Sequence, residues 1–262
     1  MNLDLSGKRA IVCGASAGIG KACAFELAAL GASVTVVARS ADKLAAVVAE
    51  LPRPRAQSHD ALTVDLADPA AARTAAHAWI AAHGACHILV LNTGGPAPGR
   101  AIDTPADAFR LGFESLLATP HELVRAFVPG MRRDGYGRII IIGSTSVKQP
   151  IQGLAVSNAV RAATANWAKT LSQELGAEGI TVNNVLPGYT RTERLGAIFR
   201  ARAEKAGVTI EQAEAAAIAD IPAGRFGEAS EIAAAVGFLA SPAASYVNGV
   251  NLPVDGGRLG TL

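Results

Sequence analysis

Short apolar runs alternate with longer helical patterns along the whole chain. The short runs are rich in β-branched residues, which are typical of strands, whereas the longer stretches are rich in Ala and Leu and follow a helical period. The short runs predict seven strands, at residues 9–13, 33–38, 62–65, 87–92, 138–143, 180–186 and 249–254. The longer stretches predict helices at residues 18–30, 41–50, 69–83, 106–134, 153–178 and 228–240. This alternation predicts a Rossmann-type, doubly wound α/β fold, in which a seven-stranded parallel sheet has helices on both faces.

The fifth predicted strand contains four consecutive isoleucines at residues 139–142, so we expect it to be buried on both faces and central. The chain has no internal repeat and no Gly/Ser linker, which favours a single domain over residues 1–262. One irregular insertion, residues 193–226, is helical in pattern and follows the sixth strand. Because it leaves the carboxyl edge of the sheet, we expect this insertion to be a substrate lid.

Charge and composition exclude several classes of partner. The 24 Lys and Arg residues nearly balance the 22 Asp and Glu residues, so nothing indicates nucleic-acid binding. No apolar run reaches the ~18 residues of a membrane span, and the first residues do not have the pattern of a signal peptide, so we expect a cytoplasmic protein without membrane contact. The three cysteines have no motif spacing, and His77, His83 and His87 lie across a helix end, so we predict reduced thiols and no metal site.

A glycine-rich loop follows the first predicted strand and leads into a helix, with Gly14, Gly18 and Gly20 in the order Gly-x-x-x-Gly-x-Gly. Glycines there permit a tight turn and let the backbone approach a diphosphate, whose charge is stabilised by the N-terminus of the helix. The loop, which also contains Ser16 and Ile19, therefore predicts a dinucleotide-binding domain.

The end of the second strand discriminates between the two nicotinamide nucleotides. A carboxylate there would bind a free ribose 2′-hydroxyl, but the sequence has Arg39 and no acid. A guanidinium suits a 2′-phosphate, so NADP(H) is favoured over NAD(H). Two observations leave the alternative open: Arg39 could instead be a solvated charge or stack on adenine, and Ala17 is neutral where a second basic residue would strengthen the argument.

The glycine spacing resembles that of the short-chain dehydrogenase/reductase family, and further motifs follow in that family's order. They are Asp65-Leu66, Asn92-Thr-Gly94-Gly95, Pro187-Gly188-Tyr-Thr-Arg-Thr192, Ile221-Pro-Ala-Gly-Arg-Phe-Gly227 and Val254-Asp-Gly-Gly257. The resemblance implies that Asp65 bonds the adenine amino group and that the segment from Pro187 to Thr192 holds the nicotinamide carboxamide. It also implies a homotetramer, or at least a homodimer, formed by the helices predicted at 106–134 and 153–178.

The family's catalytic pair is absent. The resemblance implies a Ser, a Tyr with a Lys four residues later, and an Asn from the preceding helix; Ser144 matches the Ser, but no Tyr-x-x-x-Lys occurs. The flanking residues place Leu154 at the Tyr position and Asn158 at the Lys position, and Ser115 or Leu116 at the Asn position.

Helical spacing indicates what replaces the pair. Leu154, Ser157, Asn158 and Arg161 fall at i, i+3, i+4 and i+7, so they share the face expected to look at the nicotinamide. Ser144, Asn158 and Arg161 are therefore the candidate catalytic residues. Two further hydrogen-bond donors lie within plausible reach, namely Lys148 and Tyr189.

Three functions follow from these residues. The favoured one is an oxidoreductase that transfers a hydride between NADP(H) and a small carbonyl or hydroxyl substrate of 3-oxoacyl or similar type, because the nucleotide site is complete. The second is an NADP(H)-binding protein without turnover, and the third is a lyase or isomerase on the same fold.

Overall fold

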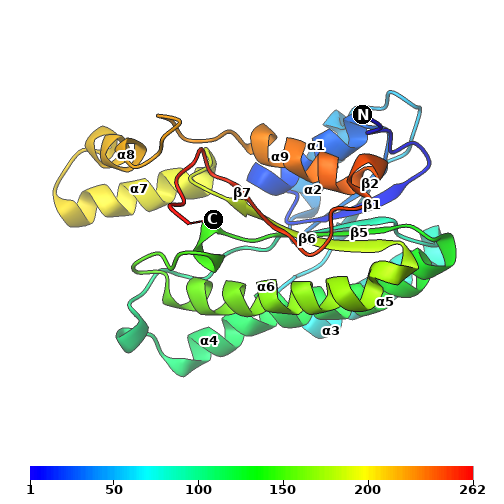
Figure 1. Cartoon of the computed structure of the whole chain (residues 1–262), viewed down its shortest axis with the longest axis horizontal. Coiled ribbons are helices and arrows are strands. Elements are labelled where there is room, and N and C mark those ends of the chain that lie inside the picture. The colour runs from blue at the N-terminus through cyan, green and yellow to red at the C-terminus, as the bar shows by residue number, and fades with distance from the viewer. Residues whose placement is uncertain (262) are drawn as a thin grey trace.

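The computed structural model describes residues 1–261, which contain one seven-stranded parallel sheet (Figure 1). The strands are β1 (Arg9–Cys13), β2 (Ser33–Ala38), β3 (Asp60–Thr63), β4 (Ile88–Leu91), β5 (Gly137–Ile142), β6 (Ile180–Pro187) and β7 (Asn251–Val254). They lie in the order β3-β2-β1-β4-β5-β6-β7. Strands β1, β2 and β3 follow one another towards one edge of the sheet, and β4 then lies on the other side of β1. A reversal of this kind opens a crevice at the carboxyl ends of the strands, where ligands bind in such sheets.

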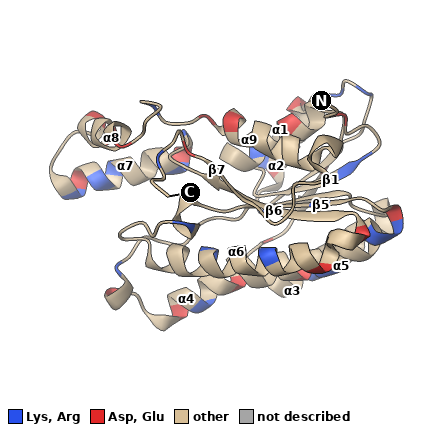
Figure 2. Ribbon diagram, in the orientation of Figure 1, with Lys and Arg blue, Asp and Glu red and all other residues tan. Residues whose placement is uncertain are grey.

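Helices cover both faces of the sheet (Figure 1). One layer contains α1 (Gly18–Ala29), α2 (Ala41–Glu50) and α9 (Ala229–Ala240); the other contains α3 (Pro69–His83), α4 (Ala106–Phe113), α5 (Thr119–Asp134) and α6 (Ala155–Leu175). Each layer has its own apolar core against the sheet, and the four isoleucines of β5 are all buried. Most charged residues lie on helices and loops rather than in the sheet (Figure 2). The predicted Rossmann-type α/β fold is confirmed.

The predicted long helix at 106–134 is interrupted by a π-helical turn, Glu114–Ala118. Pro120 accounts for this break, because it has no N–H to donate to the carbonyl of Leu116 and its ring crowds that carbonyl. The Leu116 carbonyl instead accepts a hydrogen bond from the Thr164 hydroxyl of α6, at 3.0 Å. The break therefore joins the helix pair α4/α5 to α6.

The third strand begins two residues earlier than the predicted 62–65, because its register is set by pairing with β2, from Thr35 opposite Asp60 to Ala38 opposite Thr63. Asp65 consequently follows the strand instead of ending it.

The insertion at 193–226 forms α7 (Glu193–Ala206) and α8 (Ile210–Ala219), which project from the end of the molecule where β6 stops (Figure 1). They have a small core of their own, composed of Leu195, Phe199, Ile221 and Phe226. A side-chain cap starts each helix: the Thr192 hydroxyl accepts from the Leu195 N–H, and Thr209 forms a capping box with Gln212.

Within residues 1–261, no helix combines the length and the apolarity that crossing a membrane requires. The same part of the chain contains no group of three or more His, Cys, Asp or Glu side chains arranged to hold a metal ion. Cys13, Cys23 and Cys86 are free and buried, and burial raises the pKa of each thiol to about 12.

Candidate functional site

A cleft of about 1350 Å³ lies at the carboxyl edge of the sheet, at the reversal of strand order. Its walls come from the loops after β1, β2, β3 and β4 and from the start of α7. The predicted cofactor residues that line it are Gly14, Ser16, Gly18, Ile19, Arg39, Asp65, Leu66, Asn92, Gly94 and Thr192. The structure thus brings together residues from five segments of the sequence that are far apart along the chain.

The other three predicted cofactor residues stand behind the wall of the cleft. Gly20 is buried against the carbonyl of Gly14. Pro187 ends β6, and the N–H of Gly188 donates to the carbonyl of Val254 at 3.0 Å. A Cβ on Gly188 would lie 2.8 Å from the Cα of Asp255, so this glycine permits close packing of the two chain segments.

The glycine-rich loop is shaped by its contact with the end of β4. Gly14 has a φ of +60°, and a Cβ there would lie 2.5 Å from the carbonyl oxygen of Asn92. The Asn92 amide donates to the carbonyls of Cys13 and Gly14, at 3.3 Å each. Asn92 therefore joins β1 to β4 beneath the cleft. No side chain caps the start of α1 at Gly18, which leaves the first N–H groups of this helix for an anion.

Two cations lie together at one end of the cleft. Arg39 follows β2, and Lys43 lies in the first turn of α2; both are exposed and line the cleft with Ser40. Lys43 was not predicted from the sequence, although its position four residues after Arg39 could have indicated a second cation at the site. Lys43 thus supplies the second basic group beside Arg39, which the neutral Ala17 does not provide.

Ser144 lies directly after β5, which pairs with β4 along the sheet. Its Oγ accepts a hydrogen bond from the Ser146 N–H at 3.1 Å and starts a short 3-10 turn, Thr145–Val147. A hydroxyl that accepts through a lone pair still has its own O–H to donate. Ser144 is therefore held in place with a free donor at the end of the strand.

Arg161 reaches from α6 to the end of the same strand. One guanidinium nitrogen, Nη1, donates to the carbonyl of Ile142 at 2.9 Å and to that of Gly143 at 3.0 Å. Burial lowers the pKa of Arg161 to about 10, and the positive charge of Arg194 contributes to this shift. Arg161 therefore remains a cation at neutral pH, next to the backbone that carries Ser144.

The Asn158 side chain hydrogen-bonds the backbone of Ile151, which its helical spacing does not predict. Its Nδ2 donates to the carbonyl of Ile151 at 2.8 Å, and its Oδ1 accepts from the Ile151 N–H at 3.3 Å. Leu154 precedes the helix and bridges to Gly99, so it does not share a helical face with the others. The structure thus brings Arg161 to the backbone that precedes Ser144, whereas Asn158 holds the loop before α6.

The family follows from comparison with known proteins. A family model described as Enoyl-(Acyl carrier protein) reductase matches residues 14–258. The chain belongs to the short-chain dehydrogenase/reductase family. It is 34% identical over 255 residues to the 3-oxoacyl-(acyl-carrier-protein) reductase of Escherichia coli K12, a match that covers 97% of this chain and 98% of that relative.

Two solved structures are similar over nearly the whole chain. L-sorbose reductase from Gluconobacter frateurii, complexed with NADPH and L-sorbose, has a TM-score of 0.94 and 30% identity and covers 100% of both chains. The NADPH dependent reductase YwfH, involved in bacilysin biosynthesis, has a TM-score of 0.93 and 28% identity and covers 98% of this chain and 100% of its own.

The other site candidates named from the sequence are Ser115 or Leu116, at the expected Asn position, and the donors Lys148 and Tyr189; within residues 1–261, no hydrogen bond joins any of them to Ser144. Ser115 lines the cleft and donates to the carbonyl of Gly112 at 3.2 Å. Leu116 is buried beside Arg161, in a chamber of about 20 Å³. The Tyr189 hydroxyl accepts from Arg202 of α7 at 3.1 Å, and its ring packs on Phe199 and Phe226. Lys148 is partly buried and lies at the end of the 3-10 turn Thr145–Val147.

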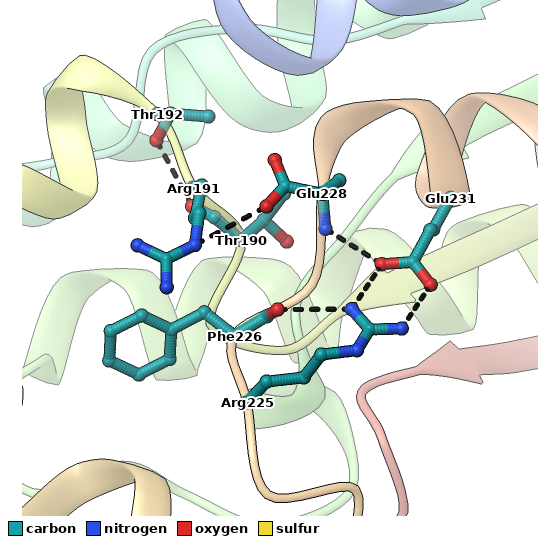
Figure 3. A network of polar contacts seen from close by, with 7 residues as sticks. All are labelled: Thr190, Arg191, Thr192, Arg225, Phe226, Glu228 and Glu231. Atoms are coloured by element: carbon teal, nitrogen blue, oxygen red, sulfur yellow. Dashed lines mark hydrogen bonds and ion pairs between the residues drawn. The ribbon is translucent and has the colours of Figure 1, made fainter. Parts of the chain in front are cut away.

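In this short-chain dehydrogenase/reductase, a polar network ties the two ends of the 193–226 insertion to each other (Figure 3). Arg225 forms two hydrogen bonds to Glu231, at 2.7 and 2.6 Å, and Glu231 also accepts from the Glu228 N–H. Arg191 pairs with Glu228 at 3.3 Å. These bonds hold the Glu231 carboxylate and lower its pKa to about 2. Arg191 and Arg225 belong to the motifs at 187–192 and 221–227, and both pair with carboxylates at the start of α9.

Proposed function

We propose that this chain is an oxidoreductase that transfers a hydride between NADP(H) and a carbonyl or hydroxyl substrate. One observation carries the proposal: a single cleft joins a glycine-rich loop, the cations Arg39 and Lys43 and the end of β4, and Ser144 follows the neighbouring strand β5. The NADPH complex of the similar L-sorbose reductase and the 3-oxoacyl reductase activity named for the Escherichia coli relative support the same reaction class.

The residues of the cleft fit this cofactor. The loop Gly14–Gly20 and the uncapped start of α1 suit a diphosphate, and Asp65 suits the adenine amino group. Arg39 and Lys43 suit a 2′-phosphate, and the two residues directly after β2, Arg39 and Ser40, include no acid to bind a free 2′-hydroxyl, so NADP(H) is favoured over NAD(H). The segment Pro187–Thr192 would hold the carboxamide. When bound, the cofactor supplies or accepts the hydride.

The chain's own residues stabilise the charge that forms on the substrate oxygen. The Ser144 hydroxyl donates a hydrogen bond to that oxygen. Arg161, held on the carbonyls of Ile142 and Gly143, places a positive charge behind it. Asn158 fixes the loop that leads into α6.

This arrangement is an atypical form of the family's catalytic site, because Tyr and Lys are replaced. A missing general acid typically costs about 10²–10⁴ in rate. The replacement of Tyr and Lys is the observation that favours the alternative, an NADP(H)-binding protein without turnover. A lyase or isomerase is the third possibility on this fold. The exposed Phe113 of α4, at 47%, supports the proposed homotetramer or homodimer.

The test has two stages. NADPH and NADH are titrated against the protein, and a panel of carbonyl and alcohol substrates is then assayed with wild type and Ser144→Ala. We expect tighter binding of NADPH than of NADH and a loss of about 10²–10³ in kcat for Ser144→Ala. Tight binding without turnover on any substrate would favour the non-catalytic alternative, and turnover unchanged by Ser144→Ala would refute the assignment of Ser144.

A further inference from the structure

The start of α7 lies directly on the glycine-rich loop. A Cβ placed on Gly18 would lie 3.2 Å from the Cγ2 of Thr192, the residue that caps α7. Arg194 is two residues further on, in the first turn of this helix, and lines the same cleft as the loop. The first turn of the insertion therefore faces the place where a diphosphate would lie.

Arg194 reaches across the cleft to its other wall. Its Nη1 donates to the carbonyl of Gly95 at 3.3 Å, at the end of the segment that follows β4. A Cβ on Gly95 would clash with the guanidinium in this position, so the glycine allows the side chain to approach the backbone closely. A hydrogen bond of 3.3 Å to a neutral carbonyl is a weak partner for a guanidinium, which prefers an anion.

The charge of Arg194 is uncompensated in the described part of the chain, where no carboxylate lies within ion-pair distance of its guanidinium. Glu193, its neighbour, lines the cleft without pairing with it. Arg194 is exposed, and its positive charge acts on Arg161. Arg194 in the cleft and the buried Arg161 thus repel each other, and an anion bound beside Arg194 would offset this repulsion.

We propose that Arg194 binds the diphosphate of the cofactor and thereby joins the 193–226 insertion to the loaded site. On binding, the guanidinium leaves the Gly95 carbonyl and pairs with the diphosphate held over Gly14–Gly20. The inference rests on the cofactor binding proposed above, but not on turnover. An anionic group of the substrate is the other anion that this side chain could meet, and the experiment separates the two.

The experiment measures dissociation constants for NADPH, NADH and adenosine 2′-monophosphate with four proteins: wild type, Arg194→Gln, Arg39→Ala and Arg200→Gln. NADPH and NADH share the diphosphate, whereas adenosine 2′-monophosphate lacks it. Arg200 lies on α7 with the same charge but outside the cleft, so Arg200→Gln is the matched control. Thermal unfolding of each variant checks the fold.

Arg194→Gln is expected to weaken NADPH and NADH by a similar factor, about tenfold or more, and to leave adenosine 2′-monophosphate unchanged. Arg39→Ala is expected to weaken only the two ligands with a 2′-phosphate, and Arg200→Gln none. Unchanged binding of both dinucleotides to Arg194→Gln overturns the inference, and a raised KM confined to anionic substrates then assigns Arg194 to the substrate. If wild type binds neither dinucleotide, the proposed function fails as well.

Discussion

Replacement of Arg161 by Met is expected to slow hydride transfer while leaving the protein folded. The side chain is nearly as long as that of Arg but has no charge. In the folded protein, lowering the pKa of Arg161 from 12.5 to about 10 corresponds to roughly 3 kcal/mol against the charged form. Met removes that penalty, but it leaves the carbonyls of Ile142 and Gly143 without their charged donor, at about 1.5–3 kcal/mol. The two effects largely cancel, so the free energy of unfolding should change by only about 1–2 kcal/mol.

The effect on rate has no such compensation. For a unit charge placed about 6 Å from the developing negative charge, an effective dielectric constant of about 20 gives a contribution of roughly 3 kcal/mol. The loss of this term lowers kcat by about 100-fold. Arg161→Lys retains a positive charge at the same place and should recover a part of the rate.

The assay is kcat as a function of pH, with NADPH saturating, for wild type, Arg161→Met and Arg161→Lys. Because the folded-state pKa of Arg161 is about 10, the wild-type kcat should fall as pH rises through about 10, and Arg161→Met should lack this fall. A variant Arg161→Met that retains its kcat but unfolds at a much lower temperature would show that Arg161 only holds β5, and would refute the reasoning.

Three further changes have defined outcomes. Gly14→Ala, at a φ of +60° and with its Cβ 2.5 Å from a carbonyl oxygen, should destabilise the protein by about 2–4 kcal/mol and weaken NADPH binding, as followed by urea unfolding and titration. Arg39→Ala with Lys43→Ala should lower the ratio of NADPH to NADH affinity at least tenfold; an unchanged ratio in titrations would contradict the selection of a 2′-phosphate. His87 is buried, and its Nδ1 accepts a hydrogen bond from the Arg9 N–H; burial lowers the pKa of the imidazole. The stability that His87 contributes is therefore present above its unfolded pKa of about 6.5 and is lost as pH falls towards the lower folded pKa. Melting temperatures from pH 7.5 to 5.0 should therefore fall less in His87→Asn than in wild type, and parallel curves would disprove this role.

The fold was predictable because its signal is repeated many times along the chain. Seven β-branched runs separated by helical patterns admit few arrangements, and the isoleucines of β5 indicate an interior strand, which lies beside the central strand β4. The boundaries were less accurate where tertiary contacts decide them. The register with β2 starts β3 at Asp60, and Pro120 turns one predicted helix into two helices with a π-helical turn between them.

The site was predictable where backbone conformation carries the signal, as in the loop from Gly14 to Gly20. It was not predictable where side chains choose between partners. Helical periodicity correctly places Asn158 one turn before Arg161, but it does not reveal that the amide bonds the Ile151 backbone. Likewise, the contact between Arg194 and Gly95 joins residues far apart in sequence, and no local sequence pattern predicts it.

The central claim is that this chain passes a hydride from NADPH to a carbonyl carbon. The most direct measurement is a single-turnover reaction of the protein with a carbonyl substrate and NADPH that carries deuterium at both C4 positions of the nicotinamide, with mass spectrometry of the product. The account predicts one deuterium on the carbinol carbon of the product, formed by wild type and about 10²–10³ times more slowly by Ser144→Ala. Tight NADPH binding with no deuterium transferred to any carbonyl substrate, by wild type at saturating concentrations, would contradict it.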